Sequence, residues 1–173
     1  AKKQSSCKSA SRGWFVDKEG ASEPNKCERG TFTSDEGQSS CLDAQAGYYV
    51  ASDGAVQQKE CPEGATSDPA ADACRTCPDG SFASAAGSPS CTLAKAGHYV
   101  SDDDRTKEIP CDEGYYSPGP GASECFACSA GSFSEATGAT KCTFAKPGWF
   151  VAVEGDSKET ECPVGKYAVD PGS

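Results

Sequence analysis

Cysteine is the residue with the most chemical potential in this chain, because 12 of the 173 residues are Cys and there is a single His. Two pairs have the spacing Cys-x-x-Cys, namely Cys74 with Cys77 and Cys125 with Cys128. Such a pair could contribute to a zinc site, which needs four ligands, or act as a redox dithiol. It could also join two neighbouring structural disulfides, the usual role of cysteines in secreted proteins. The spacing of the other cysteines bears on this choice.

A pattern in the segment from Cys77 to Cys91 recurs along the chain. Counted from Cys77 as offset 0, Gly80, Phe82 and Gly87 stand at offsets 3, 5 and 10, and Cys91 at offset 14. An offset-3 Gly is repeated in ten modules, and an offset-5 aromatic in nine of them, with Thr66 the exception. Each module is named here by its first residue, and they begin at residues 10, 27, 44, 61, 77, 94, 111, 128, 145 and 162. The period is 17 residues, and only module 61 is one residue short. Such self-similarity predicts a repeat architecture.

The modules are of two kinds. Six begin with Cys, and four begin with Ala, at Ala10, Ala44, Ala94 and Ala145. In the Ala-led modules the closing Cys at offset 14 is also missing, and its place holds Pro24, Gln58, Glu108 or Glu159. Because both cysteines disappear together, we predict that each disulfide lies within one module.

The predicted pairs are Cys27–Cys41, Cys61–Cys74, Cys77–Cys91, Cys111–Cys125 and Cys128–Cys142. Cys7 and Cys162 remain, and the partner of each is expected outside this stretch of sequence. We therefore expect the chain to be a window on a longer array. This pairing favours disulfides over a metal or redox site, and no cofactor is expected.

The composition explains why disulfides are needed. Leu, Ile, Val and Phe total 18 of the 173 residues, too few for an ordinary core. Closing a loop of about 15 residues should stabilise a module by roughly 3 kcal/mol.

The net charge of −10 argues against binding to nucleic acid or anionic membranes. The longest apolar run, residues 148–153, is too short to span a bilayer. The chain is thus expected to be extracellular or on a cell surface.

Each module is predicted to be a small β-hairpin in a disulfide-rich, mostly β or irregular fold. The offset-5 aromatic should begin one strand, the offset-10 Gly should form the turn, and the return strand should end at the closing Cys. Modules should contact only their neighbours and form an elongated rod, with a bend or a change of rotation at the shortened module 61. The expected organisation is the end of a truncated module (1–9), three groups of three modules (10–60, 61–110 and 111–161), and the start of another truncated module (162–173).

The pattern C-x2-G-[ST]-[YF]-x4-G-x3-C-x2-C resembles the cysteine-rich ephrin-receptor-like repeat, and the match is best over residues 61–91. It is also similar to the first half of a tumour-necrosis-factor-receptor module. The resemblance implies a receptor ectodomain or a large secreted or surface protein, in which such repeats serve as spacers, binding surfaces or filament-forming segments. The Ala-led modules depart from that pattern and weaken the expectation of a receptor.

Several polar residues are candidates for functional sites. His98 occupies a place held by aromatic residues in other modules, so we interpret it as a variant of that position, and no catalytic residue is expected. The run from Asp102 to Asp104 lacks the spacing of a calcium loop and is interpreted as a solvated turn. Asn25 precedes Lys-Cys and is at best a minor glycosylation acceptor, whereas the abundant Ser and Thr leave O-linked sugar open.

The most informative positions are at offset 4 of the Ala-led modules. They hold Trp14, Tyr48, His98 and Trp149, each followed by an aromatic residue and a Val. One interpretation is compensation for the missing disulfide by buried rings. The other is a periodic stripe of assembly contacts, in which the offset-4 residues face a partner and Phe15, Tyr49, Tyr99 and Phe150 pack inward.

These observations predict an extracellular structural protein that forms a rod, filament or cell-surface appendage through periodic aromatic contacts. The expected partners are copies of the chain itself or other extracellular proteins. The alternative is a receptor or adhesion ectodomain that binds a protein or glycan. An enzyme is not expected.

Overall fold

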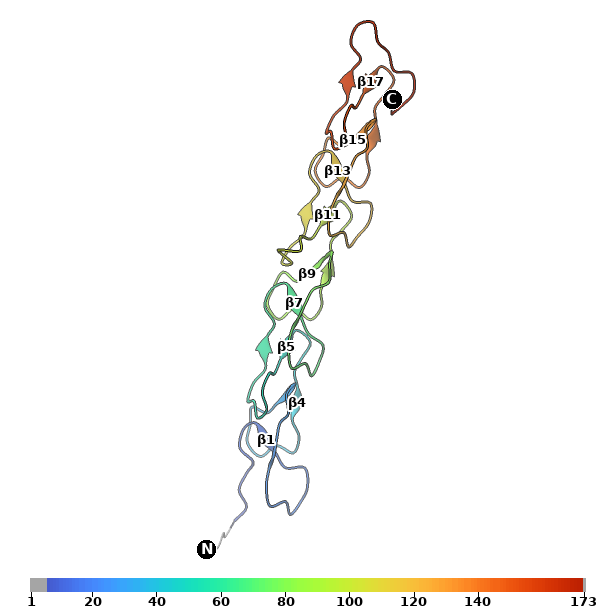
Figure 1. Cartoon of the computed structure of the whole chain (residues 1–173). Coiled ribbons are helices and arrows are strands. Elements are labelled where there is room, and N and C mark those ends of the chain that lie inside the picture. The colour runs from blue at the N-terminus through green and yellow to red at the C-terminus, as the bar shows by residue number, and fades with distance from the viewer. Residues whose placement is uncertain (1–5, 173) are drawn as a thin grey trace. The chain divides into compact units, whose positions relative to one another are not determined.

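The computed structural model describes residues 6–172, which form a series of very short hairpins (Figure 1). Within this range there is no helix, and eighteen two-residue strands pair antiparallel as nine hairpins. Cysteine-rich β modules in tandem are therefore the architecture of the described chain. The hairpins are β1 (Trp14–Phe15) with β2 (Asn25–Lys26), β3 (Thr31–Phe32) with β4 (Leu42–Asp43), β5 (Tyr48–Tyr49) with β6 (Lys59–Glu60), β7 (Ala65–Thr66) with β8 (Arg75–Thr76), β9 (Ser81–Phe82) with β10 (Thr92–Leu93), β11 (His98–Tyr99) with β12 (Ile109–Pro110), β13 (Tyr115–Tyr116) with β14 (Phe126–Ala127), β15 (Ser132–Phe133) with β16 (Thr143–Phe144), and β17 (Trp149–Phe150) with β18 (Thr160–Glu161).

The strands lie at different offsets from those expected. The first strand of each hairpin ends with the offset-5 residue instead of beginning with it, and the second strand follows the closing position instead of ending there. In module 77, for example, Phe82 pairs with Thr92, one residue after Cys91. The reason is that the residues between the strands bond to neighbouring modules, so only the two ends of the loop pair with each other.

The described residues form two compact units. One comprises residues 6–76 with 85–90, and the other comprises residues 77–84 with 91–172. Module 77 contributes its two strands to the second unit and its turn to the first. In each unit the hairpins follow one another in chain order (Figure 1).

Backbone hydrogen bonds join consecutive modules within each unit. The amide of Gly114, at offset 3, donates to the carbonyl of Ser134 in the next module at 2.8 Å. The carbonyl of Gly114 in turn accepts from the amide of Cys128 at 2.8 Å. The turn amide of Gly138 reaches back and donates to the carbonyl of Cys111 at 2.7 Å. Each module therefore satisfies much of its backbone through its neighbours, which is why a two-residue hairpin can persist.

The offset-3 glycines also contact the module after next, so the expectation that modules contact only their neighbours is wrong. Gly80 has a φ of +70°, and a Cβ built on it would lie 1.9 Å from the carbonyl oxygen of Gly121, in the turn two modules further on. Gly97 has the same relation to Gly138, with a φ of +79° and 2.1 Å. Both the left-handed conformation and the close approach of another backbone require glycine here.

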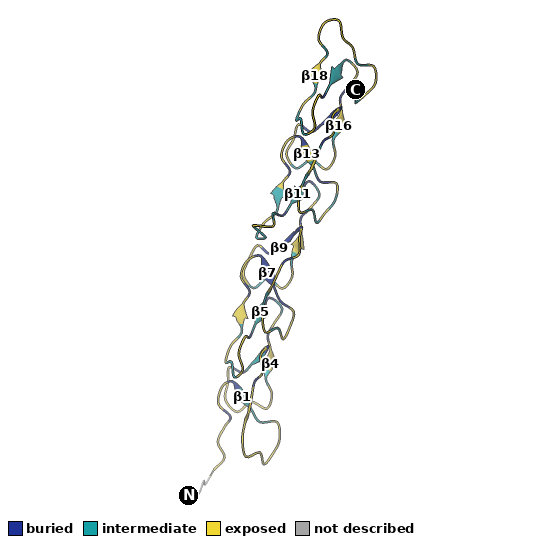
Figure 2. Ribbon diagram, in the orientation of Figure 1, coloured by how far each residue is buried: buried dark blue, intermediate teal, exposed yellow. Residues whose placement is uncertain are grey.

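The buried residues are mainly small ones at offsets 0 and 6 of the modules, and Figure 2 colours the buried segments dark blue. In the Ala-led modules these are residues such as Ala94 and Val100, which are 0% and 1% exposed. In the Cys-led modules they are the opening Cys and small residues such as Ser117. Such a core needs little Leu, Ile or Phe, which accounts for the unusual composition.

The missing residue of module 61 is absorbed within its turn. Ala70 takes the place of the turn Gly and adopts a φ of +58°, the only positive value at a non-Gly residue in the described chain. Its amide donates to the carbonyl of Ala44 at 2.8 Å, as the turn Gly does in other modules. The amide of Val50 likewise donates to the carbonyl of Ala71 at 3.0 Å. The contacts with module 44 are thus the usual ones, and a bend at module 61 stays a prediction.

Candidate functional site in the Ala-led modules

Five disulfides are present in the described residues, each within one module. They are Cys27–Cys41, Cys61–Cys74, Cys77–Cys91, Cys111–Cys125 and Cys128–Cys142, the same pairs that the sequence predicts. In both Cys-x-x-Cys joints the two cysteines belong to different disulfides, so neither joint offers a dithiol. Cys7 is free and exposed, and Cys162 is free and half-buried.

Three of the four Ala-led modules close the same gap with a hydrogen bond. In module 94, Glu108 at offset 14 accepts a hydrogen bond on Oε2 from the backbone amide of Lys95 at 2.9 Å. Its Oε1 lies 2.7 Å from Nζ of Lys95. This contact between an offset-14 side chain and the offset-1 amide is called the clasp. The same clasp joins Gln58 to the amide of Gln45 at 2.8 Å and Glu159 to the amide of Lys146 at 2.9 Å.

Sequence reasoning missed the clasps because it treated offset 14 of these modules only as a place where Cys was absent. The available signal was that three of the four residues there are Gln or Glu, which carry a side-chain acceptor on a long stem. The fourth, Pro24, has no such acceptor. In module 10 a shallow cavity of about 270 Å³ lies in this region, lined by Ser11, Trp14, Glu23 and Pro24.

The two Glu clasps carry the electrostatic signature of a stabilised carboxylate. The side-chain hydrogen bond from Lys95 lowers the pKa of Glu108, and the backbone hydrogen bond from the same residue adds to this. Desolvation opposes the shift, while the charges of Lys95 and His98 reinforce it. The pKa of Glu159 is lowered in the same way by the side-chain and backbone hydrogen bonds of Lys146.

The four offset-4 residues, Trp14, Tyr48, His98 and Trp149, are all half-buried. Two of them lie over a turn two modules further on. A Cβ on Gly87 would be 3.2 Å from the hydroxyl of Tyr48, and one on Gly138 would be 3.6 Å from Cε1 of His98. These side chains thus have a structural contact within their own unit.

The two tryptophans are paired with lysines instead. Nζ of Lys146 lies 4.0 Å from the ring centroid of Trp149, and Nζ of Lys26 lies 5.1 Å from that of Trp14. Cation–π contacts of this kind are weak when exposed to solvent. Each leaves part of a large apolar surface accessible.

At offset 5, Phe15, Tyr49, Tyr99 and Phe150 are half-buried like their offset-4 neighbours, so inward packing of these rings stays a prediction. The buried apolar residues of modules 44, 94 and 145 are the Ala at offset 0 and the Val at offset 6, namely Val50, Val100 or Val151. The backbones of different modules approach closely at the offset-3 glycines, which favours small side chains, and Phe133 of module 128 is the one buried offset-5 ring in the described chain, at 8% exposed. A β-branched side chain fits the available space.

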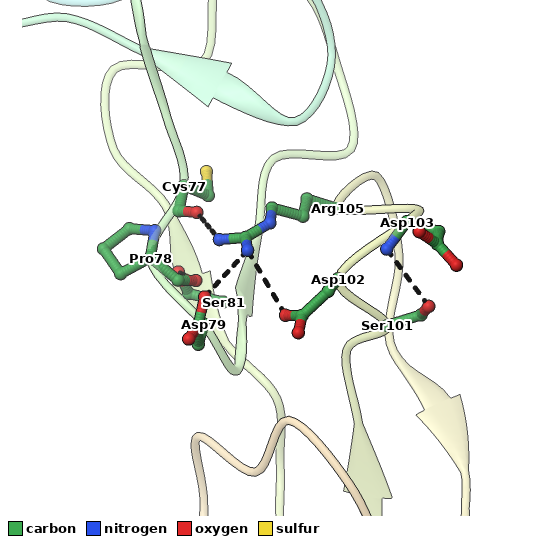
Figure 3. A network of polar contacts seen from close by, with 8 residues as sticks. All are labelled: Cys77, Pro78, Asp79, Ser81, Ser101, Asp102, Asp103 and Arg105. Carbon is green, nitrogen blue, oxygen red and sulfur yellow. Dashed lines mark hydrogen bonds and ion pairs between the residues drawn. The ribbon is translucent and has the colours of Figure 1, made fainter.

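The acidic stretch of module 94 forms a local network with Arg105 (Figure 3). Module 94 lacks the turn Gly. The Arg105 guanidinium instead donates to the carbonyl of Cys77, at offset 0 of the preceding module. In other modules the amide of the turn Gly donates to the corresponding carbonyl. The same guanidinium lies 2.7 Å from Asp79 and 3.2 Å from Asp102. The arginine therefore replaces a backbone contact that the sequence of this turn cannot supply.

The remaining aspartates of that stretch have separate contacts. The carboxylate of Asp104 accepts hydrogen bonds from the hydroxyl and amide of Thr106 and lies 3.6 Å from Nζ of Lys107. The hydrogen bonds from Thr106 lower the pKa of Asp104. Across residues 6–172, no cluster of three or more His, Cys, Asp or Glu side chains is arranged to hold a metal ion.

Comparison with known proteins gives no family for this chain. No family model matches its sequence, and no curated protein matches it significantly. In the part of the chain that the structure describes, there is also no helix with the length and apolar character needed to cross a membrane. The disulfides of the described modules are typical of extracellular proteins.

Proposed function

We propose that this chain is an extracellular structural repeat protein that assembles into a filament, coat or cell-surface appendage, and that it is not an enzyme. The observation that supports this best is the recurrence of a large, half-exposed offset-4 side chain in every Ala-led module. Aromatic side chains in such positions are favoured at protein interfaces. A repeated contact surface suits association of identical chains.

The tryptophans are the strongest candidates for these contacts. Tyr48 and His98 are partly occupied by turns of their own unit, whereas a lysine is the cation partner of Trp14 and of Trp149. Association could bury the exposed part of each indole while Lys146 keeps its partner Glu159. As part of the same proposal, we retain the resemblance to ephrin-receptor-like repeats, which occur in large surface proteins.

The test is the variant Trp149→Ser, which removes the ring from a two-residue strand without touching a cysteine. We expect weaker self-association in analytical ultracentrifugation and fewer or shorter filaments in electron microscopy, with the five disulfides intact in non-reducing peptide maps. Val153→Ser, which changes another exposed apolar residue of the same module, is the matched control. Equal association of Trp149→Ser and the parent chain would contradict a role for this ring in assembly.

A second candidate function is a receptor or adhesion ectodomain, and the cavity of module 10 favours it. The clasp is absent there, and a Trp ring and a carboxylate line the same opening. Protein or glycan ligands are often recognised by such a combination. Electron microscopy of native material separates the two proposals, because filaments favour assembly and single molecules on a membrane favour a receptor.

A further inference from the structure

Modules 94 and 145 are held closed by groups that titrate, in a chain whose other closures are mostly covalent. Glu108 uses both carboxylate oxygens, one for the amide of Lys95 and one for its ammonium group. Glu159 repeats this arrangement with Lys146. Its Oε2 accepts from the Lys146 amide at 2.9 Å, and its Oε1 lies 2.7 Å from Nζ of Lys146. The two side chains are well covered, at 22% and 12% exposed.

We propose that these two clasps are acid-sensitive latches, which loosen modules 94 and 145 at low pH while the disulfide-bonded modules and module 44 stay closed. A protonated carboxyl loses its charge, and one of its oxygens becomes a donor. The ammonium group of the lysine then has no anionic partner, and the amide has a weaker acceptor. Hydrogen bonds to charged groups are the stronger ones, so the clasp weakens.

The groups that contact each carboxylate determine the sign of the effect, and the hydrogen bonds from the lysine side chain and backbone amide contribute most. Lys95 and His98 face Glu108, and Lys146 faces Glu159. All of these favour the ionised carboxylate, so the folded pKa lies below the ordinary value. The contribution of each clasp to stability is therefore fully present above the ordinary carboxyl pKa, and it is lost as the pH falls through the lowered pKa.

Module 44 provides an internal comparison that does not titrate. Gln58 makes the same bond to the same backbone position, at 2.8 Å, but its amide is neutral over the whole pH range. The Cys-led modules are closed by covalent bonds that acid does not break. Among the Ala-led modules, the difference between Gln and Glu at offset 14 therefore separates an acid-insensitive closure from an acid-sensitive one.

The experiment measures amide hydrogen exchange by NMR on the oxidised chain between neutral and acid pH, corrected for the intrinsic pH dependence of exchange. We expect the protection of the Lys95 and Lys146 amides to fall at least about tenfold more than that of the Gln45 amide. Parallel loss of protection at all three amides would overturn the proposal, because it would indicate general acid unfolding.

Two reciprocal variants sharpen the test. Glu108→Gln should remove the acid-dependent loss at Lys95 and leave it at Lys146. Gln58→Glu should introduce an acid-dependent loss at Gln45. Unchanged pH dependence at Lys95 in Glu108→Gln would overturn the proposal. The five disulfides lie outside the altered modules, so peptide mapping shows whether they still form in each variant. Amide hydrogen exchange in the neighbouring modules shows whether the variant is folded.

Discussion

At the scale of single residues, glycine and the offset-14 side chain determine how a module closes. The offset-3 Gly combines a positive φ with the approach of a carbonyl oxygen from the module after next. The offset-14 residue bonds across the base of the loop, either as half of a disulfide or as an acceptor for a backbone amide. In both cases the side chain at offset 14 holds the base of a loop that has few apolar residues to keep it folded.

A glycine series separates the two demands on offset 3. Gly80→Ala should destabilise the oxidised chain by roughly 3–5 kcal/mol, because it adds backbone strain and a clash with the carbonyl of Gly121. Gly20 has a φ of +71°, but the space that a Cβ would occupy is open. Gly20→Ala should therefore reduce the stability by about 1–2 kcal/mol. Gly119→Ala has neither feature and should be nearly neutral. Guanidinium denaturation measures all three, and equal effects of Gly80→Ala and Gly20→Ala would rule out the clash.

At the scale of elements, each hairpin depends on contacts with other modules for its stability. A pair of two-residue strands is far below the size that is stable alone. Within its unit a hairpin such as that of module 94 gains hydrogen bonds from the module before and the module after, and a backbone contact from the module after next. The long loop between the strands is therefore ordered by neighbours, while the disulfide or clasp holds its base.

The equivalence of clasp and disulfide can be tested by exchanging them. We expect the double variant Ala94→Cys with Glu108→Cys to form a disulfide, because the corresponding Cα atoms of module 77 are 5.7 Å apart and the two modules share the same hairpin. The new bond closes a loop of about 15 residues and should stabilise the chain by up to about 3 kcal/mol.

Non-reducing peptide mapping and a free-thiol assay measure the outcome of this exchange. The single variant Glu108→Cys is the control, since it removes the clasp without supplying a partner. Persistent free thiols in the double variant would show that the base of an Ala-led module differs in geometry from that of a Cys-led one.

At the scale of the whole molecule, covalent bonds take the place of a large core. The buried side chains of the described residues are Ala, Val, Ser, Thr and half-cystine, with Phe133 the one buried ring. The net charge of −10 adds self-repulsion, which disfavours compaction. Stability of such an array is close to a sum of local terms, so it should depend steeply on the number of disulfides.

Reduction of the oxidised chain should therefore remove most of its order, including that of the Ala-led modules. Those modules contain no disulfide, but they stack on modules that do. We expect loss of amide protection at Val50 and Val100, whose amides donate to the carbonyls of Ala71 and Ala122, on treatment with a phosphine reductant, and recovery on reoxidation. The unreduced chain in the same buffer is the control. Retained protection at these two buried residues would show that the Ala-led modules are stable without their neighbours.

The sequence by itself determined the period, the module boundaries and the disulfide pairs. Each of these follows from a local rule. Glycine recurs where φ is positive, and the two cysteines of a module are present or absent together. In module 94, for example, both are absent, and Ala94 and Glu108 stand in their places. Only the tertiary structure decided where the strands pair, that a turn contacts the offset-3 Gly two modules back, and that Glu108 replaces a disulfide with a clasp. These features join residues that belong to different modules or opposite ends of a loop, and local spacing does not specify which backbone group lies opposite which side chain.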